Sequence, residues 1–192
     1  MYRLGKDYDR MDRAVYGILL DYGIASFPVD IVSLARRMGI NVLPYSALDE
    51  RRFEILISSP KTETGFLVVE KKGGSIAYTI CYNDRSQDEG RWRITIGHEI
   101  KHVVFRDPER PSPIEEELAD YFGKQINAPR AYLIHKGLSG PSEIMKTTGL
   151  GSQATSYLVQ SLQRRRERFG DAILPIEKEY IEFVKEEEAE GM

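Results

Sequence analysis

The sequence predicts an α+β fold that is mainly helical and contains a small antiparallel sheet. Three observations lead to this prediction. Apolar residues recur at helical spacing in several segments, short runs rich in β-branched and aromatic residues are separated by turn signals, and no internal repeat is present. A chain of 192 residues that is 41% hydrophobic and 30% charged has the composition of one globular domain, with room for a small appendage.

The first part of the chain predicts two helices and a strand. Residues 9–22 repeat apolar side chains at the spacing of an amphipathic helix. Residues 30–39 predict a second helix, which Asp30 can cap and Gly39 can close. Residues 40–44 then have the composition of a strand.

Three β-rich runs follow, at residues 52–58, 64–70 and 75–82. Turn signals separate them, and the last two predict a hairpin. We expect this antiparallel sheet to lead directly into a helix within residues 91–106, which Thr95 can cap at its start.

The remaining segments are predicted to be mostly helical. A proline-rich loop at 106–113 precedes a helix at 114–127 and a shorter one at 129–136. Residues 142–168 predict two helices joined by a glycine-containing turn. Residues 176–192 predict an acidic helix whose end we expect to be frayed.

The most informative stretch of the sequence is His98-Glu99-Ile100-Lys101-His102, which contains two of the chain's three histidines. Positions i and i+4 of a helix share one face, so both imidazoles can bind one metal ion. The carboxylate of Glu99 can reach a water molecule on that ion and act as a general base. This H-E-x-x-H pattern is typical of the zincin class of Zn²⁺ peptidases.

A catalytic zinc ion needs a third protein ligand, which leaves one position for water. The best candidates lie on the next helix, where Glu115, Glu116 and Glu117 are consecutive. Leu118 and Phe122 define the buried side of that helix. Periodicity alone leaves Glu115 and Glu116 competing for the role.

The segment E-E-L-A-D-Y-F-G, which begins at Glu116, resembles the second-helix motif of thermolysin-like gluzincins. This resemblance implies that Glu116 is the third zinc ligand. It also implies that Asp120 hydrogen-bonds either His98 or His102 and fixes its tautomer and basicity.

The order of elements over about residues 10–165 resembles the ImmA/IrrE family of metallopeptidases. The shared features are P-V-D-I-V-S-L-A-R-R-M-G-I-N-V, a short sheet, R-I-T-I-G-H-E-I-K-H, an E-x-x-A-D-x-F segment and a proline soon after it, Pro129. The chain departs from the family at Lys101, where a small residue is usual, and in the run before Pro129. The resemblance implies a zinc endopeptidase that cleaves or antagonises a helix-turn-helix repressor encoded beside it, often in a mobile element or prophage.

Peptide hydrolysis also needs a donor that stabilises the oxyanion besides the metal. His135 is the remaining histidine, and Tyr132 is close to it in the sequence, so both are candidates. Each has an ordinary structural interpretation as well, because a histidine is common at a helix end and a tyrosine is common in a core.

Residues 142–168 resemble a DNA-binding helix-turn-helix, with 153–163 as its recognition helix. A short basic cluster follows: Arg164, Arg165, Arg166 and Arg168. The net charge of −3 argues against nucleic-acid binding. Members of the ImmA/IrrE family carry a similar element after the peptidase core. The alternative function is therefore a non-proteolytic regulator that acts by protein or DNA binding.

These observations predict three parts: a zincin-like core at 1–137, a helix-turn-helix-like element packed on it at 138–170, and an acidic helix or tail at 171–192. The single cysteine, Cys81, excludes a disulfide within the chain and suits a reducing compartment. The N-terminus lacks an apolar signal segment, and no apolar run of about 18 residues exists. We therefore expect a cytoplasmic protein that does not enter a membrane.

Overall fold

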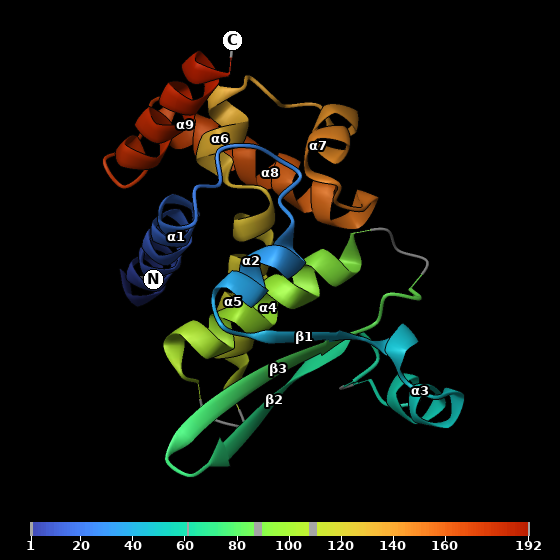
Figure 1. The fold of residues 1–192 in the computed structure, drawn as a ribbon. Helices are drawn as coiled ribbons and strands as arrows, with labels where there is room; N and C mark the ends of the chain where they lie inside the picture. The colour runs from blue at the N-terminus through green and yellow to red at the C-terminus, as the bar shows by residue number, and fades with distance from the viewer. Residues whose placement is uncertain (1, 61, 87–89, 108–110, 192) are drawn as a thin grey trace. The chain divides into compact units, whose positions relative to one another are not determined.

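The computed structural model describes residues 2–60, 62–86, 90–107 and 111–191 (Figure 1). Part of the predicted proline-rich loop (108–110) and the last residue of the predicted tail lie outside the described residues. Within them the fold is α+β, as predicted, with one small sheet and many helices. None of the described helices combines the length and apolar character that crossing a membrane requires.

The chain divides into two compact units. One is Asp30–Gly123, which contains the sheet, and the other combines Met1–Val29 with Lys124–Met192. The boundaries of these units differ from the boundaries after residues 137 and 170 that the sequence predicted.

The sheet-containing unit begins with α2 (Ile31–Arg37). Asp30 caps this helix, because its side chain accepts a hydrogen bond from the backbone N–H of Ser33 at 3.0 Å. The chain leaves this helix through Gly39 at φ +79°, a conformation that suits glycine because it has no Cβ. The strand β1 (Asn41–Pro44) and a short 3-10 turn, η1 (Tyr45–Ala47), follow. The predicted helix, cap and strand are confirmed.

The next segment corrects a prediction, because residues 52–58 are not a strand. They lie largely within α3 (Glu50–Ile57), whose first turn Asp49 caps by accepting the N–H of Arg52 at 3.0 Å. Phe53 and Ile57 are four residues apart, so their side chains lie on one face of a helix. The cap and the helical spacing override the β propensity of the individual residues.

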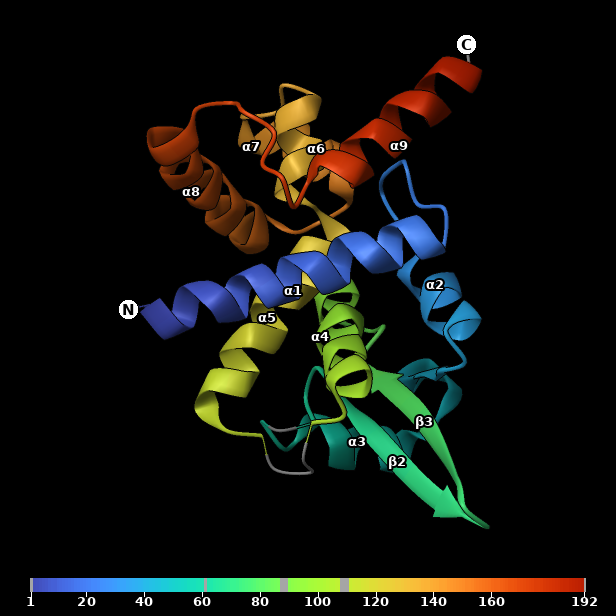
Figure 2. The same cartoon turned by 90° about the vertical axis from the view of Figure 1, so that its left-hand side faces the viewer.

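The predicted hairpin is confirmed: β2 (Gly65–Lys72) and β3 (Ser75–Tyr82) pair antiparallel, and Figure 2 shows them as a long two-stranded ribbon. However, β1 pairs with β3 in parallel, with Val42 opposite Ile80. The sheet order is β1-β3-β2, so the sheet is mixed and the prediction of a purely antiparallel sheet is wrong. The reason is that β2 reverses the direction of the chain before β3 begins, so β3 runs the same way as β1. Cys81 is buried on β3, and burial raises the pKa of its thiol.

The helix α4 (Arg91–Phe105) packs on α2 and on the hairpin strands. It begins after Gly90, at φ +103°, five residues earlier than a Thr95 cap requires. The predicted cap is therefore wrong. The hydroxyl of Thr95 instead donates to the carbonyl oxygen of Arg91, at 3.2 Å within the helix.

The following helix, α5 (Pro113–Asn127), packs closely against α4. A Cβ on Gly123 would lie 2.7 Å from the carbonyl oxygen of Ile94 and 2.9 Å from the backbone nitrogen of His98. Only glycine permits this approach. Phe122 is fully buried beside it and meets the ring of Phe105 edge-on, with centroids 6.4 Å apart.

The other unit is helical in the part of the chain that the structure describes. Its remaining helices are α1 (Tyr2–Asp21), α6 (Arg130–His135), α7 (Pro141–Thr148), α8 (Ser152–Phe169) and α9 (Lys178–Glu190). Each was predicted from the sequence, although α1 starts at Tyr2 and not at residue 9 as predicted. α9 continues to Glu190, and Tyr180, Ile181 and Val184 in its first half are buried. The fraying of its acidic end stays a prediction.

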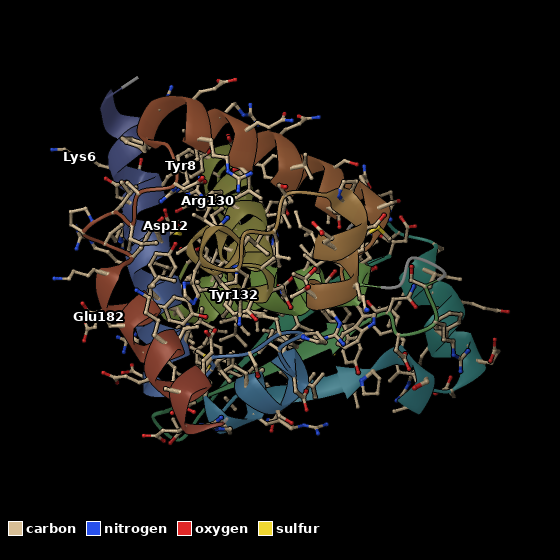
Figure 3. All side chains as sticks on the ribbon, turned by 90° about the horizontal axis from the view of Figure 1, so that it is seen from above. Lys6, Tyr8, Asp12, Arg130, Tyr132 and Glu182 are labelled. Carbon is tan, nitrogen blue, oxygen red and sulfur yellow. The ribbon has the colours of Figure 1, made fainter. Side chains whose placement is uncertain are left out.

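A ring stack and an ion pair are among the contacts that hold α1 within this helical unit. The rings of Tyr16 on α1 and Tyr180 on α9 stack with centroids 5.5 Å apart. Asp12 on α1 and Arg130 on α6 face one another in Figure 3, and an ion pair joins Oδ2 to Nη2 at 2.9 Å. The N-terminal helix therefore belongs to a unit whose other members come from the second half of the chain.

Candidate metal centre

Three of the residues predicted to be metal ligands lie together in the sheet-containing unit. His98 and His102 occupy successive turns of α4, and Glu116 lies in the first turn of α5. The two Nε2 atoms are 3.1 Å apart. The carboxylate of Glu116 has Oε2 3.2 Å from Nε2 of His98 and Oε1 3.8 Å from Nε2 of His102. This group could hold a metal ion.

The hydrogen bonds on the far side of each ring define its tautomer. Nδ1–H of His98 donates to Oδ1 of Asp120 at 2.9 Å, and Nδ1–H of His102 donates to Oδ2 of Asp107 at 2.7 Å. An ionised carboxylate can only accept, so the single proton of each neutral imidazole belongs on Nδ1. Both Nε2 atoms then direct lone pairs toward one another and toward Glu116.

Three acceptors at this separation repel one another unless a proton or a metal cation lies between them, and the combination of two imidazole nitrogens and a carboxylate fits a metal ion. The spacing agrees with a small ion. Ligand atoms about 2.0–2.1 Å from a tetrahedral ion lie about 3.3 Å from one another, and the observed separations are 3.1, 3.2 and 3.8 Å. Nitrogen and carboxylate donors of this kind bind zinc and other divalent first-row metals.

The two histidines differ in their electrostatic surroundings. Burial disfavours the charged form of His98, but the hydrogen bond to Asp120 and the neighbouring carboxylates outweigh it and raise its pKa. Burial lowers the pKa of His102, and its hydrogen bond with Asp107 only partly opposes this. His102 is therefore held neutral, which is the form that binds metals.

Glu99 lies between the two histidines in the sequence and is 9% exposed. Burial raises the pKa of its carboxyl group to about 7, while His98 lowers it and Glu116 raises it further. A carboxyl group that titrates near neutrality can both accept and return a proton at physiological pH. The positive charge of a bound metal ion would favour its ionised form.

The structure brings Glu116, and not Glu115, to the histidines. Oε2 of Glu115 accepts the backbone N–H of Ser112 at 2.6 Å, and this hydrogen bond lowers the pKa of its carboxyl group. Glu115 thus acts at the start of α5, where a carboxylate suits the helix dipole. Asp120 pairs with His98, which selects between the two partners that the gluzincin resemblance left open.

Asp107 was not predicted. The helix α4 ends at Phe105, Arg106 has φ +52°, and the N–H of Asp107 donates to the carbonyl oxygen of His102 at 3.0 Å. This helix-ending turn brings the carboxylate of Asp107 back to the ring of His102. An aspartate just beyond a helix and before a proline is the only sequence signal, and such aspartates are too common to single one out.

The burial of Lys101 beside the candidate ligands was also not predicted. This residue was noted in the sequence only because the ImmA/IrrE pattern usually has a small residue there. Its side chain is 2% exposed. The ammonium group donates to Oδ2 of Asp107 and to the carbonyl oxygen of Glu115, the latter at 3.2 Å. Lys101 therefore lies directly behind the candidate ligands.

The two predicted oxyanion donors, His135 and Tyr132, lie on α6 in the helical unit. Figure 3 labels Tyr132. Nε2 of His135 is 3.3 Å from Oε2 of Glu188 on α9. Tyr132 is buried, its ring lies 4.6 Å from that of Phe27, and burial raises its pKa. Contacts within their own unit account for both side chains, and their role as oxyanion donors stays a prediction.

Comparisons with protein-family models, curated proteins and solved structures find no match for this chain. The likeness to ImmA/IrrE peptidases therefore rests on the sequence motifs.

Proposed function

We propose that this protein is a zinc-dependent endopeptidase that cleaves a protein regulator, specifically a helix-turn-helix repressor. One observation carries the proposal. Two imidazole Nε2 atoms and a carboxylate converge with their lone pairs facing inward, and the buried carboxyl group of Glu99 lies beside them on the same helix.

Zinc at this position would polarise the scissile carbonyl group and lower the pKa of a water molecule toward neutrality. The side chains of the site transfer the proton and orient the histidine rings. Glu99 takes a proton from the attacking water as the new C–O bond forms, and it returns that proton to the amine as the C–N bond breaks. Asp120 and Asp107 keep the ring protons on Nδ1, so that both Nε2 atoms stay available as ligands.

The choice of substrate is supported by the motifs. The H-E-x-x-H on α4, the E-x-x-A-D-x-F on α5 and the proline that follows occur in the order typical of ImmA/IrrE peptidases. That resemblance implies a repressor encoded beside the peptidase. A cytoplasmic location belongs to the same proposal, since such a repressor acts on DNA.

The test is a cleavage assay with the purified full-length chain loaded with one equivalent of Zn²⁺. The substrate is the helix-turn-helix repressor encoded beside its gene, and products are identified by mass spectrometry. We expect one dominant cut, abolished by 1,10-phenanthroline and restored by added zinc. An intact repressor after prolonged incubation with the zinc-loaded protein would contradict the proposal.

The alternative is a non-proteolytic regulator that acts by protein or DNA binding. In its favour, α7 and α8 are joined by a short turn and contact one another. The contacts of the basic cluster argue against DNA binding, because two of its arginines are paired with carboxylates. Nη2 of Arg165 lies 2.6 Å from Oε2 of Glu177 in a buried pair, and Nε of Arg166 lies 2.7 Å from Oδ1 of Asp171. Both contacts reduce the positive charge available to phosphates.

Binding to duplex DNA tests this alternative. It predicts retention that falls steeply with salt and is lost when the exposed residues Arg164 and Arg168 are both replaced by alanine. The endopeptidase proposal predicts repressor cleavage that the same double substitution leaves unchanged.

A further inference from the structure

Lys101 is a buried cation placed directly behind the candidate metal centre. Its side chain is 2% exposed, and it lies on α4 between Glu99 and His102 of the H-E-x-x-H motif. An ammonium group is costly to bury unless acceptors surround it. Its acceptors therefore indicate what this lysine does.

The contacts of Lys101 join three segments of the unit. Its ammonium group donates to Oδ2 of Asp107, in the turn after α4, and that same oxygen accepts Nδ1–H of His102 at 2.7 Å. It also donates to the carbonyl oxygen of Glu115 at 3.2 Å, at the start of α5. Glu116 is the next residue along that helix.

We propose that Lys101 is a positioning residue that presets the metal ligands, an inference that rests on the proposed metal centre. By holding Asp107 it fixes the orientation of the His102 ring. By holding the carbonyl group of Glu115 it fixes the backbone from which the Glu116 side chain extends. The ligands on the two helices are thereby held at binding distance before the ion arrives.

Positioning and simple electrostatics predict opposite results when the lysine is removed. A positive charge near a divalent cation repels it, so a purely electrostatic role predicts tighter metal binding without the lysine. A positioning role predicts weaker binding, because Asp107 and the first turn of α5 lose their common anchor. The sign of the change in affinity distinguishes the two.

The test uses Co²⁺ as the probe, since its visible absorption reports both binding and coordination geometry. The full-length wild type, Lys101→Met and Lys178→Met are titrated in competition with a chelator. Lys178 is the matched control, because it lies in the helical unit and its side chain is 72% exposed. We expect Lys101→Met to bind Co²⁺ about tenfold to a hundredfold more weakly, with an altered spectrum, and Lys178→Met to match the wild type. Equal or tighter binding by Lys101→Met would overturn the proposal.

A double-mutant cycle with Asp107→Asn shows whether Lys101 acts through Asp107. The double variant should lose less affinity for Co²⁺ than the sum of the two single losses, because the effect of Lys101 on the His102 ring passes through Asp107. Independent, additive losses would overturn the proposal. If Lys101→Met does not fold, Lys101→Gln replaces it under the same criterion, because its amide can reach only part of the contacts.

These measurements separate the inference from the proposed activity. A wild type that binds Co²⁺ but whose zinc form leaves the repressor intact contradicts the endopeptidase, while the role of Lys101 is still decided by the affinities. A wild type that binds no Co²⁺ contradicts both.

Discussion

Gly123 of α5 lies directly against the backbone of Ile94 in α4, so closely that a Cβ on the glycine would be 2.7 Å from the carbonyl oxygen of Ile94. This contact sets the distance between the helix that carries the two histidines and the helix that carries Glu116 and Asp120. We predict that Gly123→Ala destabilises the protein by about 1–3 kcal/mol, because the helices must separate to admit the methyl group. Urea unfolding measures the loss, and the same variant should bind Co²⁺ more weakly.

Gly17→Ala is the matched control for this substitution. Gly17 also lies inside a helix, α1, but a Cβ at this position would meet nothing within 4 Å. Alanine is a better helix former than glycine by about 0.5–1 kcal/mol. The control should therefore be more stable than the wild type, and a Gly123→Ala protein that is equally stabilised would refute the tight contact.

Glu99→Gln should separate metal binding from hydrolysis. The amide keeps the size of the side chain but cannot accept the proton of the attacking water. We expect the variant to retain one zinc ion per chain while repressor cleavage falls by about 10²- to 10⁴-fold. Elemental analysis and the cleavage assay on one preparation check both halves, and wild-type turnover by the variant would remove Glu99 from the mechanism.

Alanine at Glu116 and at Glu115 should have different effects on metal content. Glu116 faces both histidines, whereas Glu115 bonds the backbone of Ser112. Glu116→Ala, like His102→Ala, should lose the metal, and Glu115→Ala should keep it. Metal content is measured after dialysis against buffer without metal. A Glu116→Ala protein that stays fully loaded would place the third ligand elsewhere.

Removing the cap of α2 should cost stability in a pH-dependent way. Asp30 accepts both the N–H and the hydroxyl proton of Ser33, and these hydrogen bonds lower the pKa of its carboxyl group. Asp30→Ala should destabilise the protein by about 1 kcal/mol at neutral pH. Because the folded-state pKa is lowered, the stabilisation is complete above the ordinary value of about 4 and disappears as pH falls through the lowered value.

Denaturant unfolding of the wild type and Asp30→Ala across the acid range checks this prediction. The difference in unfolding free energy should be constant from pH 7 to about pH 5 and should shrink below about pH 4. A difference that does not change down to pH 2 would show that the ionised carboxylate is not the source of the stabilisation.

The buried pair of Arg165 and Glu177 should be sensitive to the loss of one partner. Nη2 of Arg165 also donates to the carbonyl oxygen of Ala172 at 2.8 Å, and Oε2 of Glu177 accepts the N–H of Leu174 at 2.9 Å. Glu177→Ala leaves a buried guanidinium without its counter-charge, so we expect a loss of about 3–5 kcal/mol. Thermal unfolding measures it. A loss as small as that of an exposed ion pair would contradict the burial.

The predictions from sequence succeeded where local spacing determines the geometry. A helix fixes residues i and i+4 on one face, so His98 and His102 had to lie together once α4 formed. The partner on α5 depended on how two helices pack, and periodicity left two glutamates open. The close approach at Gly123 decides between them, and tertiary contacts of that kind do not appear in a local pattern.

The failures of sequence prediction have equally physical causes. Asp107 reaches His102 only because Arg106 adopts a positive φ, which no motif required. The segment 52–58 contains good β formers, yet the cap at Asp49 makes it helical. The parallel pairing of β1 with β3 depends on the path of the intervening chain, so strand composition did not reveal it.

The burial of Cys81 has a practical consequence for anyone who labels this protein. It is the single cysteine of the chain, it is 6% exposed, and its raised pKa keeps it in the thiol form that reacts slowly with maleimides and iodoacetamides. A second cysteine introduced on the exposed surface of α3 or on the hairpin would therefore take up a fluorophore or spin label selectively. Distance measurements with such labels would therefore not require Cys81 to be replaced first, because Cys81 itself would take up little label.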